Sequence, residues 1–178
     1  LIDGKAICDG YADTVTMLFN MAGIDSASAN GVNKNKNEGH TVNFAKLDGE
    51  YYYFDASADS IINEKGFKPA FYFGMSWEEA SDSFTFAAEF ANRCPKAEKS
   101  LLSDSIDIVI SDNSDATVEN MAELLRSGGD TGIIARLDES ITDEERKNIT
   151  SDTAERVGEQ LMSLSATNGL YGIKIYKE

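Results

Sequence analysis

Three residues in the first third of the chain have side chains that together could carry out nucleophilic chemistry. Cys8 stands in GKAICDGYA, His40 is the only histidine, and Asp55 follows the aromatic run EYYYF. A cysteine thiolate is a nucleophile, an imidazole can take up its proton, and a carboxylate behind the imidazole fixes its tautomer. Cys8 also lies at the start of a predicted helix, where unpaired amides and the positive dipole end favour thiolate over thiol.

Whether His40 and Asp55 meet depends on the hairpin between them. HTVNFAKL and EYYYFDAS are β-prone runs separated by Asp48-Gly49, a strong signal for a two-residue turn. With that turn, Val42 faces Asp55 and His40 faces Ser57, so these four side chains share one face. His40 and Asp55 are then diagonal neighbours with α-carbons about 7–8 Å apart, within reach of a side-chain hydrogen bond. A one-residue change of loop length without a bulge would put them on opposite faces.

Each of the three residues also has an ordinary structural explanation. A cysteine before an amphipathic helix is usually a small buried hydrophobe. A lone histidine at the start of a strand is more often a hydrogen-bonded polar residue than a base. An aspartate near a strand end usually caps a neighbouring turn or is solvated. The residue types alone leave both interpretations open.

The order and context of these residues resemble a known family. GKAICDGYADTVTMLFNMAGI followed by GHTVNFAKLDGEYYYFDAS is similar to the transglutaminase-like superfamily in its bacterial, papain-like form, over roughly residues 4–80. The resemblance implies a papain/transglutaminase-like core, in which a helix carrying the cysteine packs on an antiparallel sheet carrying the histidine and aspartate. It also implies that Cys8 is the nucleophile, His40 the base and Asp55 the orienting acid of a cysteine-dependent amide-bond hydrolase or acyl transferase. Its substrates would be proteins or peptides, with cell-wall peptides among them.

The chain departs from the family pattern in three places. Val42 stands where members often carry tryptophan, and Ser57 stands where threonine is common. The helical segment that precedes the cysteine in the family, and helps to hold the oxyanion, is missing. We therefore expect the chain to begin partway through a longer protein, N-terminally truncated relative to the family. Losing one oxyanion donor typically lowers the rate about 10²–10³-fold, so the alternative is a catalytically weak or inactive binding module on a bacterial surface protein.

Sequence periodicity predicts the elements that must position these residues. Apolar side chains recur at helical spacing from Asp9 to about Met21, and Gly23 follows as a helix stop. SASANGV predicts a short strand, and NKNKNEG predicts a polar loop before the hairpin. Farther along, INEKGFKPAFYFGM predicts loop and strand. Ser76 with Glu79 forms a capping-box pattern that opens a helix through WEEASDSF.

The second half of the chain begins a new pattern after a polar, proline-containing stretch at 92–104, which predicts a linker. SIDIVIS, TGIIARLD and LYGIKIYK predict three strands, and TVENMAELLRSGG predicts a helix. Thr142 with Glu145 caps a long helical region predicted to end near Asn168-Gly169. This β-α-β-α-β order predicts a small two-layer α/β domain. The predicted fold class is therefore α+β, with a catalytic domain at 1–100 and an accessory domain at 105–178 that carries no catalytic residue.

Composition excludes several classes of protein. The chain has 178 residues, 42% of them hydrophobic, and a net charge of −15. It is therefore globular, and it offers no basic face for nucleic acid or anionic lipid. No apolar run approaches the ~20 residues that span a membrane, so we expect no membrane insertion in this segment. An extracytoplasmic or cell-surface location is expected from the resemblance alone.

No cofactor or metal is expected. The carboxylate clusters SDNSDATVE and LDESITDEE lack the alternating ligands and the glycine of a calcium loop. One histidine and two separated cysteines do not suit a structural zinc site. Cys8 and Cys94 stand in unlike contexts, so we do not expect them to form a disulfide.

Overall fold

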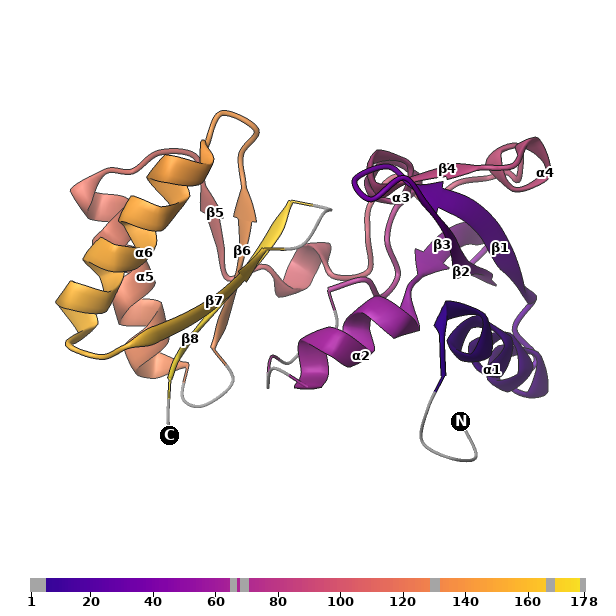
Figure 1. Ribbon diagram of the computed structural model, residues 1–178, viewed down its shortest axis with the longest axis horizontal. Helices are drawn as coiled ribbons and strands as arrows, with labels where there is room; N and C mark the ends of the chain where they lie inside the picture. Colours follow the sequence, from indigo (N-terminus) through magenta and orange to yellow (C-terminus); the bar gives the residue numbers. More distant parts are fainter. Residues whose placement is uncertain (1–5, 65–66, 68–70, 129–131, 166–168, 177–178) are drawn as a thin grey trace. The chain divides into compact units, whose positions relative to one another are not determined.

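The computed structural model describes residues 6–64, 67, 71–128, 132–165 and 169–176 (Figure 1). The chain divides into two compact units. The first consists of Leu1–Ile61 and Ala70–Ser103, and the second of Ile62–Pro69 and Asp104–Glu178. Each unit contains its own four-stranded sheet. The division after Ser103 falls within the expected linker at 92–104. Ile62–Pro69 groups with the second unit, whereas the sequence predicts it in the first.

The first unit is built on an antiparallel sheet with the strand order β3-β2-β1-β4. Helix α1 packs against strands β1 and β2. The elements in chain order, with α2 continuing past the division, are α1 (Cys8–Met21), β1 (Ser26–Asn33), β2 (Glu38–Leu47), β3 (Glu50–Phe54), α2 (Ala56–Glu64), α3 (Trp77–Ser83), β4 (Phe84–Phe86) and α4 (Ala88–Ala91).

The hairpin between β2 and β3 has the register that the sequence predicts. Leu47 pairs with Glu50, which leaves Asp48-Gly49 as a two-residue turn. Both turn residues have positive φ, 50° for Asp48 and 93° for Gly49. This is the turn class that matches the twist of a two-residue hairpin, and Asp-Gly suits it because both residue types tolerate the left-handed region. The prediction for the first helix is also confirmed, and this helix begins at Cys8 itself.

The segment after the hairpin differs from the prediction. Residues 56–64 form helix α2, where the sequence predicted a loop from residue 62. Residues 71–75 form turns and one isolated bridge, between Met75 and Tyr53, in place of a strand. Residues 65–66 and 68–70 of the predicted loop and strand lie outside the described residues. Helix α2 forms because Asp55 caps it: the Asp55 carboxylate accepts a hydrogen bond from the Ala58 amide at 3.0 Å.

Helix α3 has the predicted capping box. The Glu79 amide donates to the Ser76 hydroxyl, and the Ser76 amide donates to the Glu79 carboxylate. The helix ends at Ser83, and Phe84 begins strand β4, which pairs with β1. Strand β4 was not predicted. Three residues are too few for a clear alternation, and this strand exists because β1 has an edge for it to pair with.

The predicted linker at 92–104 is in part a packed segment of the first unit, and the linker interpretation is wrong for that part. The Tyr51 amide donates to the Pro95 carbonyl at 2.9 Å, and the Ala97 amide donates to the Tyr51 carbonyl at 3.1 Å. Ala97 is buried. These bonds form because strand β3 has an unpaired outer side, and the segment satisfies its backbone groups there.

The second unit is a two-layer α/β structure. Its sheet has the order β5-β6-β8-β7, with β5 parallel to β6 and the other pairs antiparallel. Helices α5 and α6 lie side by side on one face of this sheet (Figure 1). The elements are a short 3₁₀ turn η1 (Ser103–Ser105) at the division, β5 (Ile108–Ile110), α5 (Asp115–Ser127), β6 (Ile133–Leu137), α6 (Asp143–Val157), β7 (Leu161–Ser165) and β8 (Leu170–Ile175).

One long helix of the second unit is shorter than predicted. The Thr142 and Glu145 capping box is present, but α6 ends at Val157. Gly158 follows with a φ of 76°, the left-handed conformation that commonly terminates helices. Residues 161–165 then form strand β7, which pairs with β8. The observed order is therefore β-α-β-α-β-β, and the helical prediction up to Asn168-Gly169 is wrong because Gly158 stops the helix.

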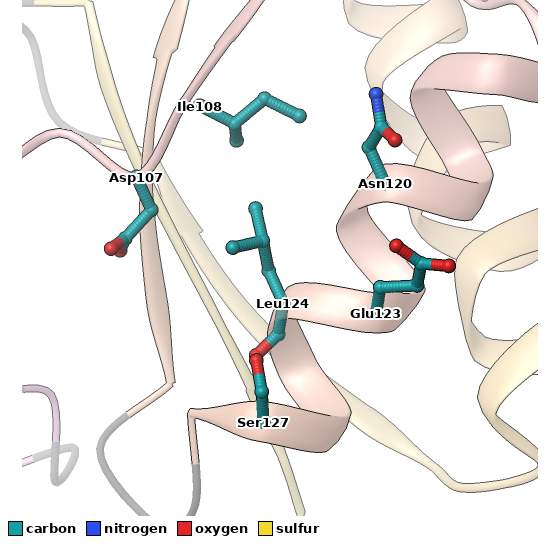
Figure 2. Close-up of a pocket in the computed structure, with 6 residues that line it drawn as sticks. All are labelled: Asp107, Ile108, Asn120, Glu123, Leu124 and Ser127. Atoms are coloured by element: carbon teal, nitrogen blue, oxygen red, sulfur yellow. The ribbon is translucent and has the colours of Figure 1, made fainter.

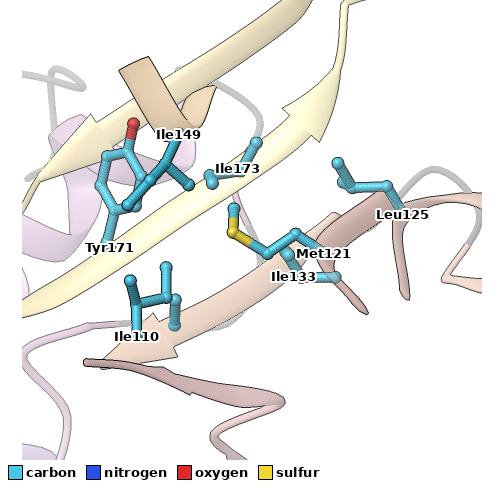
Figure 3. Close-up of a cluster of buried hydrophobic side chains, with 8 residues drawn as sticks. Ile110, Met121, Leu125, Ile133, Ile149, Tyr171 and Ile173 are labelled. Carbon is cyan, nitrogen blue, oxygen red and sulfur yellow. The ribbon is translucent and has the colours of Figure 1, made fainter. Parts of the chain in front are cut away.

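The core of the second unit lies between its sheet and its two helices (Figure 3). Strands β5, β6 and β8 contribute side chains of alternating positions, which point to one face of a sheet. Helices α5 and α6 cover that face with side chains at helical spacing. The buried members are Ile110, Met121, Leu125, Ile133, Ala135, Ile149, Tyr171 and Ile173.

Candidate active site

His40 and Asp55 form a close pair in the first unit. His40 lies on β2, Asp55 directly follows β3, and His40 Nε2 is 2.7 Å from Asp55 Oδ2. The Asp55 side chain is 3% exposed, whereas that of His40 is 22% exposed. This is the diagonal contact that the hairpin register predicts. The buried carboxylate therefore stands behind an imidazole that solvent and small groups can still reach.

The surroundings of Asp55 keep its carboxylate ionised. Burial by itself would raise the pKa of Asp55, but the hydrogen bonds from His40, Ser57 and Ala58 lower this pKa below its usual value. The Ser57 hydroxyl donates to Asp55 Oδ1 at 2.6 Å, and the Ala58 amide donates to the same oxygen at 3.0 Å. Asp55 thus caps helix α2 with one oxygen and holds His40 with the other. The capping role and the orienting role coexist in one side chain.

The tautomer of His40 follows from this hydrogen bond. An ionised carboxylate only accepts, so Nε2 carries the proton and Nδ1 of the neutral ring holds the free lone pair. Phe84 of β4 stacks on the imidazole, with ring centroids 5.4 Å apart and the planes at 6°. The ring is therefore held by a hydrogen bond at one nitrogen and by an aromatic face along its plane. Nδ1 is the atom placed to take up a proton.

Cys8 is the first residue of α1 and is partly exposed. Ile7 occupies the position before the helix and makes no side-chain cap, so amides of the first turn have no capping side chain there. The Cys8 Sγ donates to Asp9 Oδ1 over 4.0 Å. In the described part of the chain, Cys8 makes no hydrogen bond to His40 or Asp55. The structure therefore joins His40 and Asp55 by a hydrogen bond, while the role of Cys8 stays a prediction.

The first half of α1 is bound to the strand that carries His40. The Thr41 hydroxyl donates to Asp9 Oδ1, and Asn43 Nδ2 donates to the Ala12 carbonyl at 2.7 Å. Because Thr41 and Asn43 face α1, the alternation of the strand places His40 on the opposite face. The helix turn that carries the cysteine is thus held beside the residue that follows His40.

The same turn of α1 is also bound to helix α2. The Tyr11 hydroxyl lies 2.9 Å from the Ser60 hydroxyl, within hydrogen-bonding distance. Helix α2 starts directly after Asp55. The turn that carries Cys8 is therefore held on two sides, by the strand of His40 and by the helix that Asp55 caps.

Two residues near the pair were missed by sequence reasoning. Phe84 stacks on His40, and it was assigned to the end of a helix, so no signal pointed to it. Asp59 is buried, and its pKa is raised to about 7, chiefly by this burial. The hydrogen bond from the Tyr72 amide lowers the pKa of Asp59, and the nearby Asp55 carboxylate raises it. Asp59 lies on α2, four residues after the Asp55 that caps this helix. A correctly predicted α2 would therefore have placed the two carboxylates one helical turn apart.

Metal and membrane sites are not seen in the described part of the chain. No group of three or more histidine, cysteine, aspartate or glutamate side chains there is arranged to hold a metal ion. No helix there has the length and apolar character needed to cross a bilayer. Cys8 and Cys94 are both free thiols.

The chain matches no protein-family model and no curated protein. The fold is of the predicted α+β class, with two units, one of which carries a buried aspartate bonded to a partly exposed histidine.

Proposed function

We propose that this chain is a cysteine-dependent amide-bond hydrolase or acyl transferase that uses Cys8, His40 and Asp55. The observation that carries the proposal is the His40–Asp55 pair, with the carboxylate buried and the imidazole partly exposed. The cysteine at the start of α1, on a turn bound to Thr41, supports it. A cysteine-bearing helix packed on an antiparallel sheet is also what the resemblance to the transglutaminase-like superfamily implies.

The reaction would proceed through an acyl-enzyme. His40 Nδ1 takes the proton of the Cys8 thiol, and the thiolate attacks the amide carbonyl. The imidazolium, stabilised by Asp55, then protonates the departing amine as the C–N bond breaks, leaving a thioester on Cys8. Water, or a second amine, adds to the thioester and releases the acyl group. The proposal requires the Cys8 sulfur to leave Asp9 and approach His40.

Hydrolysis is the favoured outcome, because the exposed side of His40 gives water access to the reacting atoms. Amine transfer would require that water be excluded from the reacting atoms. The proposed substrates are proteins or peptides, with cell-wall peptides among them, and the proposed location is extracytoplasmic or at the cell surface. Substrate class and location rest on the resemblance.

Alkylation of the two free thiols tests the proposal without a known substrate. We expect iodoacetamide to modify Cys8 faster than Cys94 at pH 7, measured by peptide mapping over time. His40→Gln should slow modification of Cys8 about tenfold, because the thiolate then loses its cationic partner, and should leave Cys94 unchanged. Cys94 serves as the internal control for general accessibility. Equal rates at the two thiols, or a Cys8 rate unaffected by His40→Gln, would contradict the proposal.

A second candidate function is a binding module with no catalytic activity. It is favoured by one observation: the Cys8 thiol donates to the Asp9 carboxylate, and in the described residues it makes no hydrogen bond to His40. The Asp9→Asn variant separates the two candidates. If the chain is an enzyme, removing this charge raises the alkylation rate of Cys8 in a manner that still requires His40. If it is a binding module, the rate is unaffected by His40 in both backgrounds.

A further inference from the structure

Strand β5 forms one edge of the sheet in the second unit. It pairs with β6 on one side, and in the described residues no strand pairs with its other side. The strand is apolar, and Val109 at its centre is 61% exposed. An edge strand presents unpaired amides and carbonyls, and proteins usually protect such edges with charges or bulges. An apolar edge left open is therefore a surface on which another extended chain can pair.

A groove runs between this edge and helix α5 (Figure 2). It has a volume of about 500 Å³ and is open to solvent. Asp107 and Ile108 line it from the strand side. Side chains at helical spacing line it from α5, namely Asn120, Glu123, Leu124 and Ser127. An edge strand flanked by a helix groove is the geometry in which an added strand places alternate side chains into a pocket.

The chemistry of the groove selects for a basic ligand. Figure 2 shows Ile108 and Leu124 directed toward one another across the groove, which makes its apolar part. Asp107 and Glu123 are both exposed, and the described lining contains no lysine or arginine. The Asp107 carboxylate accepts a hydrogen bond from the Ile134 amide of β6 at 2.7 Å and is directed away from the other lining side chains (Figure 2), so Glu123 supplies the negative charge at the groove. The groove is thus apolar at its centre and negative on its α5 side.

We propose that this groove binds an extended, basic peptide segment of a partner protein by strand addition to β5. Backbone hydrogen bonds to the edge give affinity, an apolar side chain between Ile108 and Leu124 gives register, and a flanking lysine or arginine meets Glu123. Side chains on the other face of the added strand lie beside Val109. This inference concerns the second unit alone and does not depend on the proposed catalytic function.

Fluorescence anisotropy with the whole chain tests the inference. The probe is a fluorescein-labelled nonapeptide of alternating lysine and valine, titrated at low ionic strength. We expect saturable binding, with shifted backbone amide signals at residues 107–110 and along α5 in NMR spectra. Glu123→Lys should weaken binding about threefold to tenfold, because it reverses a rim charge. Glu155→Lys, the same exchange at an exposed position of α6 outside the groove, should change affinity less than about twofold.

Two control peptides make the outcome decisive. The same sequence with alternate amides N-methylated cannot pair with an edge, and we expect it to bind about tenfold more weakly. A counterpart with glutamate in place of lysine should not bind. The proposal is overturned if the unmethylated peptide fails to bind, if N-methylation has no effect, or if Glu155→Lys acts like Glu123→Lys. It is also overturned if sedimentation shows that a second copy of the chain fills the groove.

Discussion

Asp55 and Asp59 are two carboxylates four residues apart whose environments shift their pKa values in opposite directions. Hydrogen bonds from His40 and Ser57 more than offset the burial of Asp55 and lower its pKa. Asp59 receives an amide hydrogen bond from Tyr72, and its burial prevails and raises its pKa to about 7. One group is therefore ionised at neutral pH, and the other is close to half protonated. Pairs of titratable groups whose pKa values are shifted in opposite directions often mark functional sites.

Asp59 makes the protein less stable as the pH rises. Its pKa is about 7 in the folded state, against about 3.9 for an unfolded aspartate, so the folded state binds more protons between these values. The free energy of unfolding should therefore fall as the pH goes from about 4 to about 7, by up to about 4 kcal/mol from this group. We expect Asp59→Asn to remove this part of the pH dependence, measured by urea denaturation at several pH values.

The diagnostic quantity in that experiment is the slope of the free energy of unfolding against pH. An asparagine still accepts the Tyr72 amide, and any loss from its new amide group is independent of pH in this range. Asp112→Asn, at a fully exposed position where the carboxylate pKa is lowered and not raised, is the matched control and should leave the slope between pH 4 and pH 7 unchanged. Equal slopes for the natural chain and Asp59→Asn would contradict the assigned cause.

Among the elements, the hairpin of β2 and β3 decides whether the His40–Asp55 pair exists. A strand that slips by one residue turns every side chain to the other face. The two-residue turn at Asp48-Gly49 prevents this slip because both residues adopt positive φ. The contact at the site is therefore determined several residues away from it.

Substitution of Gly49 should show how much free energy a residue with a β-carbon loses at this positive φ. Gly49 has a φ of 93°, and no atom lies within 4 Å of the position that a β-carbon would occupy. Gly49→Ala should thus lower the free energy of unfolding by about 1–2 kcal/mol through backbone strain alone. Gly39→Ala is the matched control, because Gly39 also has open space around it but no positive φ. Urea denaturation midpoints compare the two, and an equal loss for both variants would show that φ is not the cause.

At the scale of the whole molecule, each unit has a sheet and a set of buried side chains of its own. Met121 is fully buried in the second unit, where it contacts the cluster between sheet and helices. Met121→Ala should destabilise that unit by about 2–5 kcal/mol, since it leaves a cavity. Hydrogen exchange should then speed up in α5, β6 and β8.

The same variant tests whether the candidate active site is independent of the second unit. We expect the alkylation rate of Cys8 to stay within about twofold of the natural chain under native conditions, because the residues of the site belong to the first unit. A parallel loss of Cys8 reactivity and of hydrogen-exchange protection in strand β2 would show that the units unfold together. The proposal of a separate accessory domain at 105–178 would then fail.

The sequence by itself determined the parts of this structure that depend on interactions between residues close together in the chain. The Asp48-Gly49 turn set the hairpin register, and with it the His40–Asp55 contact, because a two-residue turn leaves one pairing of the flanking strands. Helix α1 and the capping boxes of α3 and α6 followed from periodicity and from side chains that bond to nearby amides.

Only the tertiary structure decided the features that need a partner far along the chain. Strand β4 exists because it pairs with β1, and that pairing brings Phe84 onto His40. The segment 94–97 is held because β3 has an open side, and β7 forms because β8 returns beside it. Helix α1 is held on β2 by the hydrogen bond from Thr41 to Asp9, which joins residues 32 positions apart. Such contacts depend on which surfaces meet in three dimensions, and short-range sequence patterns carry no record of that.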